Sequence, residues 1–380
     1  MKVCFVLEYY YPHIGGFEVL FQHLAEGIVE AGHQCTVVTC RLPGTKQRET
    51  VNGVDLHRVS VPALGDRYWF TLAGIHQAWQ QAKRADIVIT TTYNGTFPAW
   101  LASRLTRKPA VIVLLEVIGK NWHSIGLNPA LALGYRVFED AVLRLPFERY
   151  ISISNSTRNA LAKRGIARDR ISLAYPGIDH KLFNPAGRSG RRADRRSELG
   201  FDPDAFVYLY FGRPGYMKGI DFLVKAAPLI KQRIPQARLL LLLSRKPDQG
   251  YRRVIDLINA SGLVLGQDVI VLDPVPRAEL PDTLQASDCV VVPSLSEGFG
   301  FTCVEACTMD IPVVASAAGS LPEVIFGRHV LVEPGNAQAI ADGVERVFRK
   351  DTTITDKKTF LWQDMIDAHL ATYAEAVFNK

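Results

Sequence analysis

The chain has 380 residues, of which 48% are hydrophobic and 22% charged. These proportions are ordinary for a globular protein and exclude a disordered chain, a collagen-like fibre and a coiled coil. The length indicates two or three domains. The 44 basic and 38 acidic residues leave a net charge of +6, which suits an anionic small molecule or an anionic membrane surface. A nucleic-acid-binding protein would usually be more basic, so no nucleic-acid partner is expected.

No apolar run approaches the ~18 residues that a membrane span needs. The first apolar run, residues 3–7, is too short for the core of a signal peptide. We therefore expect a cytoplasmic protein that at most contacts the inner face of the membrane. The cysteines show no metal-ligand spacing and no C-x-x-C pair, which predicts buried thiols in a reducing compartment. They are Cys4, Cys35, Cys40, Cys289, Cys303 and Cys307.

The first half alternates short apolar runs with amphipathic stretches. A strand is predicted at residues 3–7, and a helix follows Gly15 and Gly16 and ends at Gly32. Several of the runs are apolar throughout, as in strands of a parallel sheet that is covered by helices on both faces. Further strands are predicted at residues 35–40, 56–60, 86–91, 110–115 and 150–154.

The second half repeats this pattern after a change in composition. Residues 187–200 (GRSGRRADRRSELG) are rich in glycine and arginine and lack apolar periodicity, which predicts an exposed basic linker. The same arginines could instead form a phosphate-binding or membrane-binding patch, although a charge run is more often simply solvated. A terminal amphipathic helix is predicted from residue 360 onward. Strands are predicted at residues 206–211, 239–243, 269–272, 289–292 and 313–316.

The pattern therefore predicts an α/β protein with two doubly wound, Rossmann-like domains that face each other across a ligand-binding cleft. The N-terminal domain spans residues 1–186 and the C-terminal domain residues 201–358, with the linker 187–200 between them. No internal sequence repeat is evident.

Three loops between a strand and a helix carry candidate chemistry. Gly15 and Gly16 could bring helix N–H groups to an anion, or form a plain tight turn. Arg213 and Lys218 stand in a glycine-rich loop that suits a diphosphate; the alternative is two solvated cations. Glu297 and Glu305 could accept hydrogen bonds from sugar hydroxyls, or act only as solvated or helix-start carboxylates.

These loops resemble motifs of one large family. The segment SEGFGFTCVEACTMDIPVVASAAGSLPEVI is similar to the E-x7-E segment of family 4 retaining glycosyltransferases, with Glu297 and Glu305 as its glutamates. FGRPGYMKGIDFLVKAA resembles the diphosphate-binding segment of that family, and YYPHIGGFEVLFQHLAEGIVEAGHQCTVVT its N-terminal glycine loop. SISNSTRNAL, PGIDHKLFNP and LWQDMIDAHLATYAEAV extend the resemblance over nearly the whole chain.

The resemblance implies a GT-B fold, with an acceptor-binding first domain, a donor-binding second domain and a terminal helix (360–380) that packs back on the first. It implies transfer of a sugar from a nucleotide-diphosphate sugar, with retention of anomeric configuration and without a metal or other cofactor. The acceptor would be a sugar, a lipid-linked compound or a small molecule, and the product a cell-envelope component, a glycolipid or a polysaccharide. Glu297, Gly298, Phe299 and Gly300 would hold the donor sugar and Glu305 the ribose. Arg213 and Lys218 would neutralise the leaving diphosphate, with Gly15 and Gly16 contacting phosphate.

The chain departs from this family pattern at one reactive position. Leu115 stands where members usually carry a histidine, and Glu116 follows it. His123 is the nearest histidine further along the chain and is a candidate substitute, the alternative being an exposed loop histidine. Asp310 replaces a glycine that is usual before the Pro-Val-Val strand. Leu115 keeps open a second class, a non-catalytic member that binds a nucleotide sugar or a partner; a two-lobed solute-binding protein is disfavoured by the expected lack of a signal peptide.

Membrane contact is predicted from two features of the sequence. Arginines in the expected linker would each add ~1 kcal/mol near an anionic surface. Trp69 and Phe70 would add apolar contact. The arginines are Arg188, Arg191, Arg192, Arg195 and Arg196.

Overall fold

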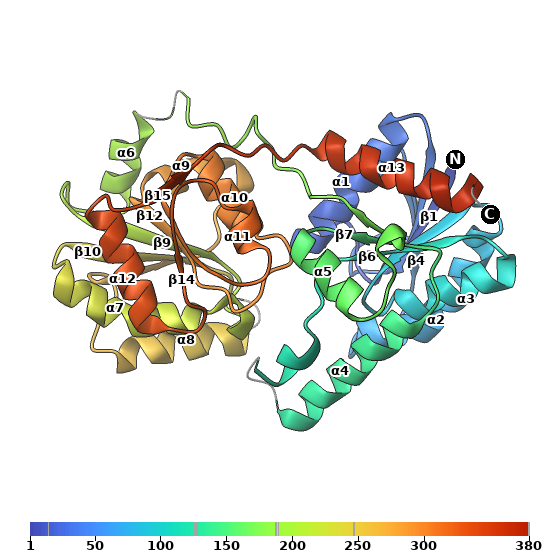
Figure 1. Ribbon diagram of the computed structural model, residues 1–380, viewed down its shortest axis with the longest axis horizontal. Coiled ribbons are helices and arrows are strands. Elements are labelled where there is room, and N and C mark those ends of the chain that lie inside the picture. The colour runs from blue at the N-terminus through green and yellow to red at the C-terminus, as the bar shows by residue number, and fades with distance from the viewer. Residues whose placement is uncertain (14, 125–127, 187, 189, 246–247, 379–380) are drawn as a thin grey trace. The chain divides into compact units, whose positions relative to one another are not determined.

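The structure is a computed structural model that describes residues 1–13, 15–124, 128–186, 188, 190–245 and 248–378. It divides into two compact units, one formed by Met1–Gly177 with Phe360–Lys380 and the other by Ile178–Thr359. Each unit is built on one sheet with helices on both of its faces (Figure 1). The fold is the predicted α/β architecture with two doubly wound units.

The sheet of the first unit has the strand order β3-β4-β2-β1-β5-β6-β7-β8. All neighbours pair in parallel except β3, which runs antiparallel to β4. The strands are β1 (Lys2–Val6), β2 (Gln34–Cys40), β3 (Arg48–Val51), β4 (Val54–Val59), β5 (Ile87–Thr91), β6 (Ala110–Leu114), β7 (Arg149–Ser152) and β8 (Ile171–Leu173).

The helices of the first unit connect successive strands, and the last one comes from the far end of the chain. Helix α13 (Trp362–Phe378) packs against α1 and against β5 to β8, so the terminal helix packs back on the N-terminal unit as the resemblance implied. The others are α1 (Gly16–Glu30), α2 (Asp66–Ala82), α3 (Thr96–Thr106), the short helix η1 (Gly119–Ser124), α4 (Pro129–Arg144), α5 (Asn155–Lys163) and the turn η2 (Arg168–Arg170).

The sheet of the second unit has the order β11-β10-β9-β12-β13-β14-β15, parallel except for β15. Its strands are β9 (Phe206–Gly212), β10 (Ala237–Leu243), β11 (Val269–Leu272), β12 (Cys289–Val292), β13 (Val313–Ser316), β14 (Gly327–Val332) and β15 (Thr353–Thr355). Its helices are α6 (Arg191–Glu198), α7 (Ile220–Arg233), α8 (Asp248–Ala260), α9 (Leu280–Gln285), α10 (Phe301–Thr308), α11 (Leu321–Val324) and α12 (Ala337–Phe348), with turns η3 (Tyr216–Lys218) and η4 (Arg277–Glu279).

The continuous apolar runs form the buried centre of each sheet. Every residue of β5, β6, β12 and β13 is buried, because helices cover both faces of a parallel sheet. In the second unit α7, α8 and α12 pack their apolar stripes on one face of the sheet. All six cysteines are buried and free, which confirms their prediction as buried thiols.

In its described residues the basic segment 187–200 is largely exposed, as predicted, but it is not an interdomain linker, because it lies inside the second unit and the unit boundary comes earlier, after Gly177. Residues Arg191–Glu198 form α6, which packs on α9. Asp282 pairs with Arg188 and with Arg191 at 2.8 Å. Asp288 pairs with Arg192 and Arg196. These arginines therefore form ion pairs within the second unit. The sequence pattern could not predict this, because the acidic partners lie about ninety positions further along the chain.

Among the residues that the structure describes, no helix is both long and apolar enough to cross a membrane.

Candidate functional site

The site in the second unit lies where the strand order changes direction. Strands β9 and β12 are neighbours, with β10 beyond one and β13 beyond the other. In doubly wound sheets ligands bind outside the carboxyl ends of strands at this switch point. The chain leaves β9 into a loop that starts at Arg213 and leaves β12 into a loop that starts at Pro293. The two sequence motifs are thus brought to one edge of one sheet.

Close backbone contacts hold these two loops together. The N–H of Leu295 donates to the carbonyl oxygen of Met217 at 2.8 Å. Gly219 has a φ of +66°, and a Cβ there would collide with the carbonyl group of Pro293. Glycine is required at this position on two counts, since a side chain would be strained as well as obstructed. The approach of the loops fixes the spacing of the charged side chains that they carry.

Lys218 and Glu297 form an ion pair across the two loops. The Lys218 Nζ lies 2.6 Å from the Glu297 Oε1, and the Ser294 hydroxyl donates to the same oxygen at 3.0 Å. The Glu297 side chain is only 9% exposed, whereas Lys218 is 36% exposed. Arg213 is exposed, and its guanidinium makes no hydrogen bond or ion pair within the described part of the chain. The site therefore holds one neutralised cation and one available cation.

The backbone of Glu297 is fixed by a third loop, the one after β13. The Ser320 N–H and hydroxyl donate to the Glu297 carbonyl oxygen at 3.0 and 3.1 Å. Gly319 packs so closely that a Cβ would collide with the Glu297 backbone. Gly300 has a φ of +87° and is the N-cap of α10. Gly298 and Phe299 lie between these fixed points, with the Phe299 ring buried edge-on against Phe301 at 5.1 Å.

Glu305 is the second carboxylate of the motif and is buried on α10. Burial raises its pKa to about 7, although the nearby Arg277 acts in the opposite direction. The Arg277 Nη2 lies 3.0 Å from the Glu305 Oε1. Sequence reasoning did not identify Arg277, and a lone arginine after the β11 run carries no motif that would have marked it.

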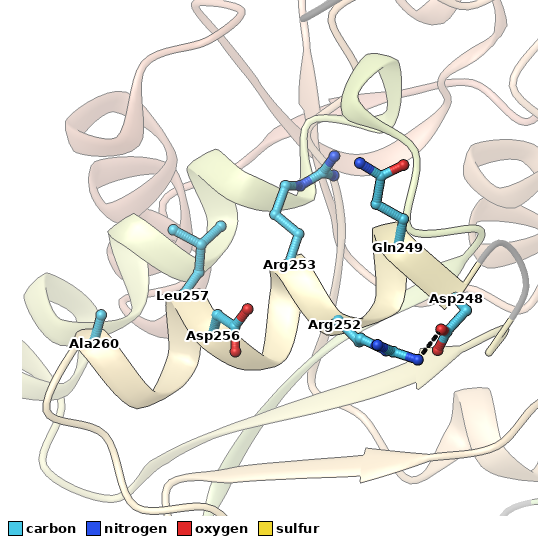
Figure 2. A pocket seen from close by; sticks show the side chains of 7 residues that line it. All are labelled: Asp248, Gln249, Arg252, Arg253, Asp256, Leu257 and Ala260. Atoms are coloured by element: carbon cyan, nitrogen blue, oxygen red, sulfur yellow. Dashed lines mark ion pairs between the residues drawn. The ribbon is translucent and has the colours of Figure 1, made fainter.

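Helix α8 supports the loop that carries Arg213. The Arg253 guanidinium donates to the Pro214 carbonyl oxygen at 3.1 Å and lies 3.0 Å from a carboxylate oxygen of Asp221. Gly250 lies so near the Pro214 carbonyl that a Cβ would stand 2.7 Å from it. Figure 2 shows Arg253 and Gln249 extending from one side of α8, while Arg252 pairs with Asp248 on another. The open groove of about 600 Å³ along α8 is thus beside a structural anchor of the loop.

The first unit has a matching arrangement that sequence reasoning missed. Glu8, just after β1, is only 3% exposed and pairs with Arg67 of α2. It also accepts the Asn94 backbone N–H at 3.1 Å and side-chain NH₂ at 2.6 Å. Asn94 follows β5, the neighbour of β1 at the switch point of this sheet. A glutamate placed directly after a buried strand was the available signal.

Gly15 and Gly16 lie at the start of α1, as predicted, but a carboxylate of the same helix occupies this end. Gly15 is the N-cap, and a Cβ there would collide with the carboxylate of Glu18. Glu18 is buried and pairs with His13 at 2.8 Å. A carboxylate favours a helix N-terminus for the same reason that a phosphate does. His123 belongs to η1, but its side chain lies outside the described residues.

The comparisons with known proteins agree with these motifs. Residues 14–182 match the model described as Glycosyltransferase Family 4, and residues 191–358 match the model described as Glycosyl transferases group 1. The chain therefore contains a family 4 glycosyltransferase domain followed by a group 1 glycosyltransferase domain. A protein of Methanocaldococcus jannaschii described as an uncharacterized glycosyltransferase is 27% identical over 91% of this chain and 89% of its own length.

Other relatives match over a shorter span. The D-inositol 3-phosphate glycosyltransferase of Pseudarthrobacter chlorophenolicus is 36% identical over 53% of this chain and 48% of its own length. The chain covers 47–60% of the length of seven relatives with this name.

Solved structures confirm the GT-B fold. Sucrose-phosphate synthase from Thermosynechococcus elongatus has a TM-score of 0.76 at 22% identity, over 99% of this chain and 96% of its own. Anabaena HepE, in complex with UDP and glucose, has a TM-score of 0.73 at 21% identity, over 99% and 94%.

Proposed function

We propose that the chain transfers a sugar from a nucleotide-diphosphate sugar to a hydroxyl-bearing acceptor, with retention of anomeric configuration and without a metal or other cofactor. The observation that carries the proposal is the ion pair between Lys218 and Glu297, with the unpartnered Arg213 in the same loop system. Within the described residues, no cluster of three or more His, Cys, Asp or Glu could hold a metal ion.

The two cations stabilise the charge that develops on the departing diphosphate. Bond cleavage between the sugar and the diphosphate moves negative charge onto the leaving group, and preplaced cations lower the energy of that state. Arg213 is available for this, and Lys218 becomes available when the diphosphate replaces Glu297 as its partner. The carboxylate released in this exchange then accepts hydrogen bonds from the hydroxyls of the donor sugar.

The remaining motif residues position the donor. Gly298, Phe299 and Gly300 present backbone groups of a loop that is fixed at both ends. Glu305, in its carboxylate form, accepts hydrogen bonds from the ribose, and Arg277 keeps a positive charge beside it. Gly15 and Gly16 contact phosphate after the Glu18 carboxylate has moved away from the N-terminus of α1. His123 serves the reaction in place of the histidine that Leu115 replaces.

A non-catalytic nucleotide-sugar-binding protein is the second candidate, and Leu115 favours it. Leucine has no donor or acceptor to assist the reacting carbon. Measuring the hydrolysis of UDP-, GDP- and ADP-sugars over hours separates the two candidates. A transferase can slowly transfer the sugar to water and needs its diphosphate site to do so, whereas a non-catalytic binding protein does not hydrolyse the donor. Some structural neighbours were solved with UDP or UDP-glucose, and we propose a UDP-sugar as the first donor to test.

Arg213→Ala should reduce the rate at which nucleotide is released from the donor by ~10²-fold, as the loss of a group that stabilises transition-state charge does in other enzymes. Arg349→Ala removes an exposed arginine that pairs with Glu345 of α12 and should leave the rate unchanged. Equal rates in both variants and the wild type would contradict the diphosphate assignment.

We propose that the reaction is cytoplasmic and builds a glycolipid or polysaccharide. Peripheral membrane contact stays a prediction that no longer rests on the ion-paired arginines. Phe70 is fully buried, but Tyr68, Trp69 and Leu72 of α2 are 54%, 51% and 63% exposed, and these apolar side chains are its remaining support.

A further inference from the structure

The first unit contains a cavity of about 620 Å³ at the carboxyl edge of its sheet. Residues after β5 (Thr92, Tyr93 and Asn94) and after β6 (Glu116) form one side, and α4 forms another. The cavity lies wholly within this unit. It adjoins the Glu8 cluster, because Arg67 and Asn94 both line it and both bind Glu8. The cavity is therefore at the ligand-binding edge of this sheet.

Aromatic side chains dominate the wall. Trp122 stacks on Tyr135 with ring centroids 5.1 Å apart and planes 19° from parallel. The hydroxyl groups of Tyr135 and Tyr68 lie 3.0 Å apart, which joins α4 to α2. The indole N–H of Trp122 is buried and has no hydrogen-bond partner in the described chain. Tyr93, Phe138 and Leu131 add further apolar surface. The wall thus offers flat apolar faces and at least one unused donor.

The charges around the cavity disfavour an anion. The one cationic side chain among the described lining residues, Arg67, is neutralised by the buried Glu8. Two carboxylates, Glu116 and Glu139, also line the cavity. Glu139 accepts the N–H groups of Ile118 and Gly119 at 2.8 and 2.7 Å and lies 3.3 Å from Arg164. A phosphate is normally bound by cations or N–H groups that have no competing partner.

We propose that this cavity binds the acceptor, and that the acceptor is an uncharged hydroxyl compound with an aromatic or apolar ring face rather than a phosphorylated one. The inference rests on the proposed function, since it names the acceptor class of that reaction. Ring faces pack on Trp122 and Tyr135, and hydroxyl groups donate to the carboxylates at the wall. D-inositol 3-phosphate, which appears in the names of several relatives, has the charge that this wall disfavours.

The test is calorimetric titration of the full chain, without donor, with phenyl β-D-glucoside and with D-inositol 3-phosphate. No donor is needed, because the lining residues all belong to one unit. We expect the Kd of the glucoside to be at least about tenfold lower than the Kd of D-inositol 3-phosphate. Tyr135→Ala and Trp122→Ala should each raise the Kd of the glucoside by about tenfold. Trp69→Ala removes an exposed aromatic residue of α2 outside the cavity and should leave its Kd unchanged.

Thermal melting and retained nucleotide binding establish that each variant is folded. No saturable glucoside binding to the wild type, phosphate binding of equal or higher affinity, or unchanged glucoside binding in both cavity variants would overturn the inference. Donor hydrolysis, measured separately, keeps the two proposals apart. A chain that hydrolyses the donor but fails these titrations refutes only the acceptor class. A chain that binds the glucoside through Tyr135 but never hydrolyses a donor refutes the proposed function.

Discussion

Lys218→Ala should affect both activity and stability, whereas Arg213→Ala should affect activity alone. Lys218 is the ion-pair partner of the Glu297 carboxylate, which is 9% exposed. Removing the ammonium leaves this carboxylate with the Ser294 hydroxyl as the other side-chain partner that the structure shows. A buried charged group that loses its partner costs more than the ~1–3 kcal/mol of a neutral one. Lys218 is itself about one-third exposed, so water can enter, and we expect a loss of about 2 kcal/mol in the free energy of unfolding.

For a unit of this size that loss corresponds to a fall in Tm of about 4–8 °C. Differential scanning calorimetry measures it directly. Arg213→Ala, which breaks no ion pair in the described chain, should melt within about 1 °C of the wild type. In Lys218→Ala/Glu297→Gln the unpaired charge is gone, so the double variant should recover most of the lost stability as a coupling between neighbours. Equal melting of the two single variants would refute the reasoning, as would a double variant less stable than Lys218→Ala.

Three further predictions concern the end of α10, the buried carboxylate of that helix and the glycine that packs on the Glu297 backbone. Asp310 follows α10 and has a φ of +57°; its N–H donates to the Cys307 carbonyl oxygen, and the N–H of Ile311 donates to the Ala306 carbonyl oxygen. Because glycine adopts this backbone conformation without strain, Asp310→Gly should raise the unfolding free energy by about 0.5 kcal/mol in urea titrations. A destabilised variant would contradict this prediction. Glu305 has a folded pKa of about 7 against an ordinary 4.5, so the native state binds more protons between these values and stability falls as pH rises through them. Glu305→Gln should abolish that fall, worth up to about 3 kcal/mol, which melting at pH 5 and pH 8 checks. Gly319→Ala should lower Tm and nucleotide affinity together, since a Cβ collides with the Glu297 backbone; unchanged affinity would show that the loop can shift.

The central strands could be predicted from the sequence, but the edge strands could not. Strands β5, β6, β12 and β13 are short, largely apolar runs without alternation and are buried along their whole length, as strands of a covered parallel sheet are. Strand β3 (RETV) and strand β15 (TIT) are polar, and each pairs antiparallel at the edge of its sheet. Their strand structure comes from the neighbour to which they bond, not from burial of their own side chains.

The same limit applies to charges that pair over long distances in the sequence. The arginines of α6 were expected to be solvated, because Asp282 and Asp288 stand in another part of the chain. Arg67 and Glu8 lie 59 positions apart, and Arg277 and Glu305 are 28 apart. A local pattern identifies one member of each pair at most. The motif residues Lys218 and Glu297 could be singled out because each stands in a loop between a strand and a helix and in a segment that resembles the family. Neither signal predicted that the two side chains pair with each other.

Both switch points share one electrostatic arrangement that bears on ligand binding. Glu297 with Lys218 and Glu8 with Arg67 each place a buried carboxylate beside a cation at the carboxyl edge of a sheet. Each pair is neutral without a ligand, which avoids the large cost of an isolated buried charge. The diphosphate that we propose at Lys218 would therefore replace an existing partner, so its binding free energy would be the difference between two ion pairs. The displaced Glu297 carboxylate would need new donors, which the hydroxyls of the proposed donor sugar can supply. Phosphate and sugar should consequently bind cooperatively at Glu297, and a nucleoside diphosphate alone should bind more weakly than the intact nucleotide sugar.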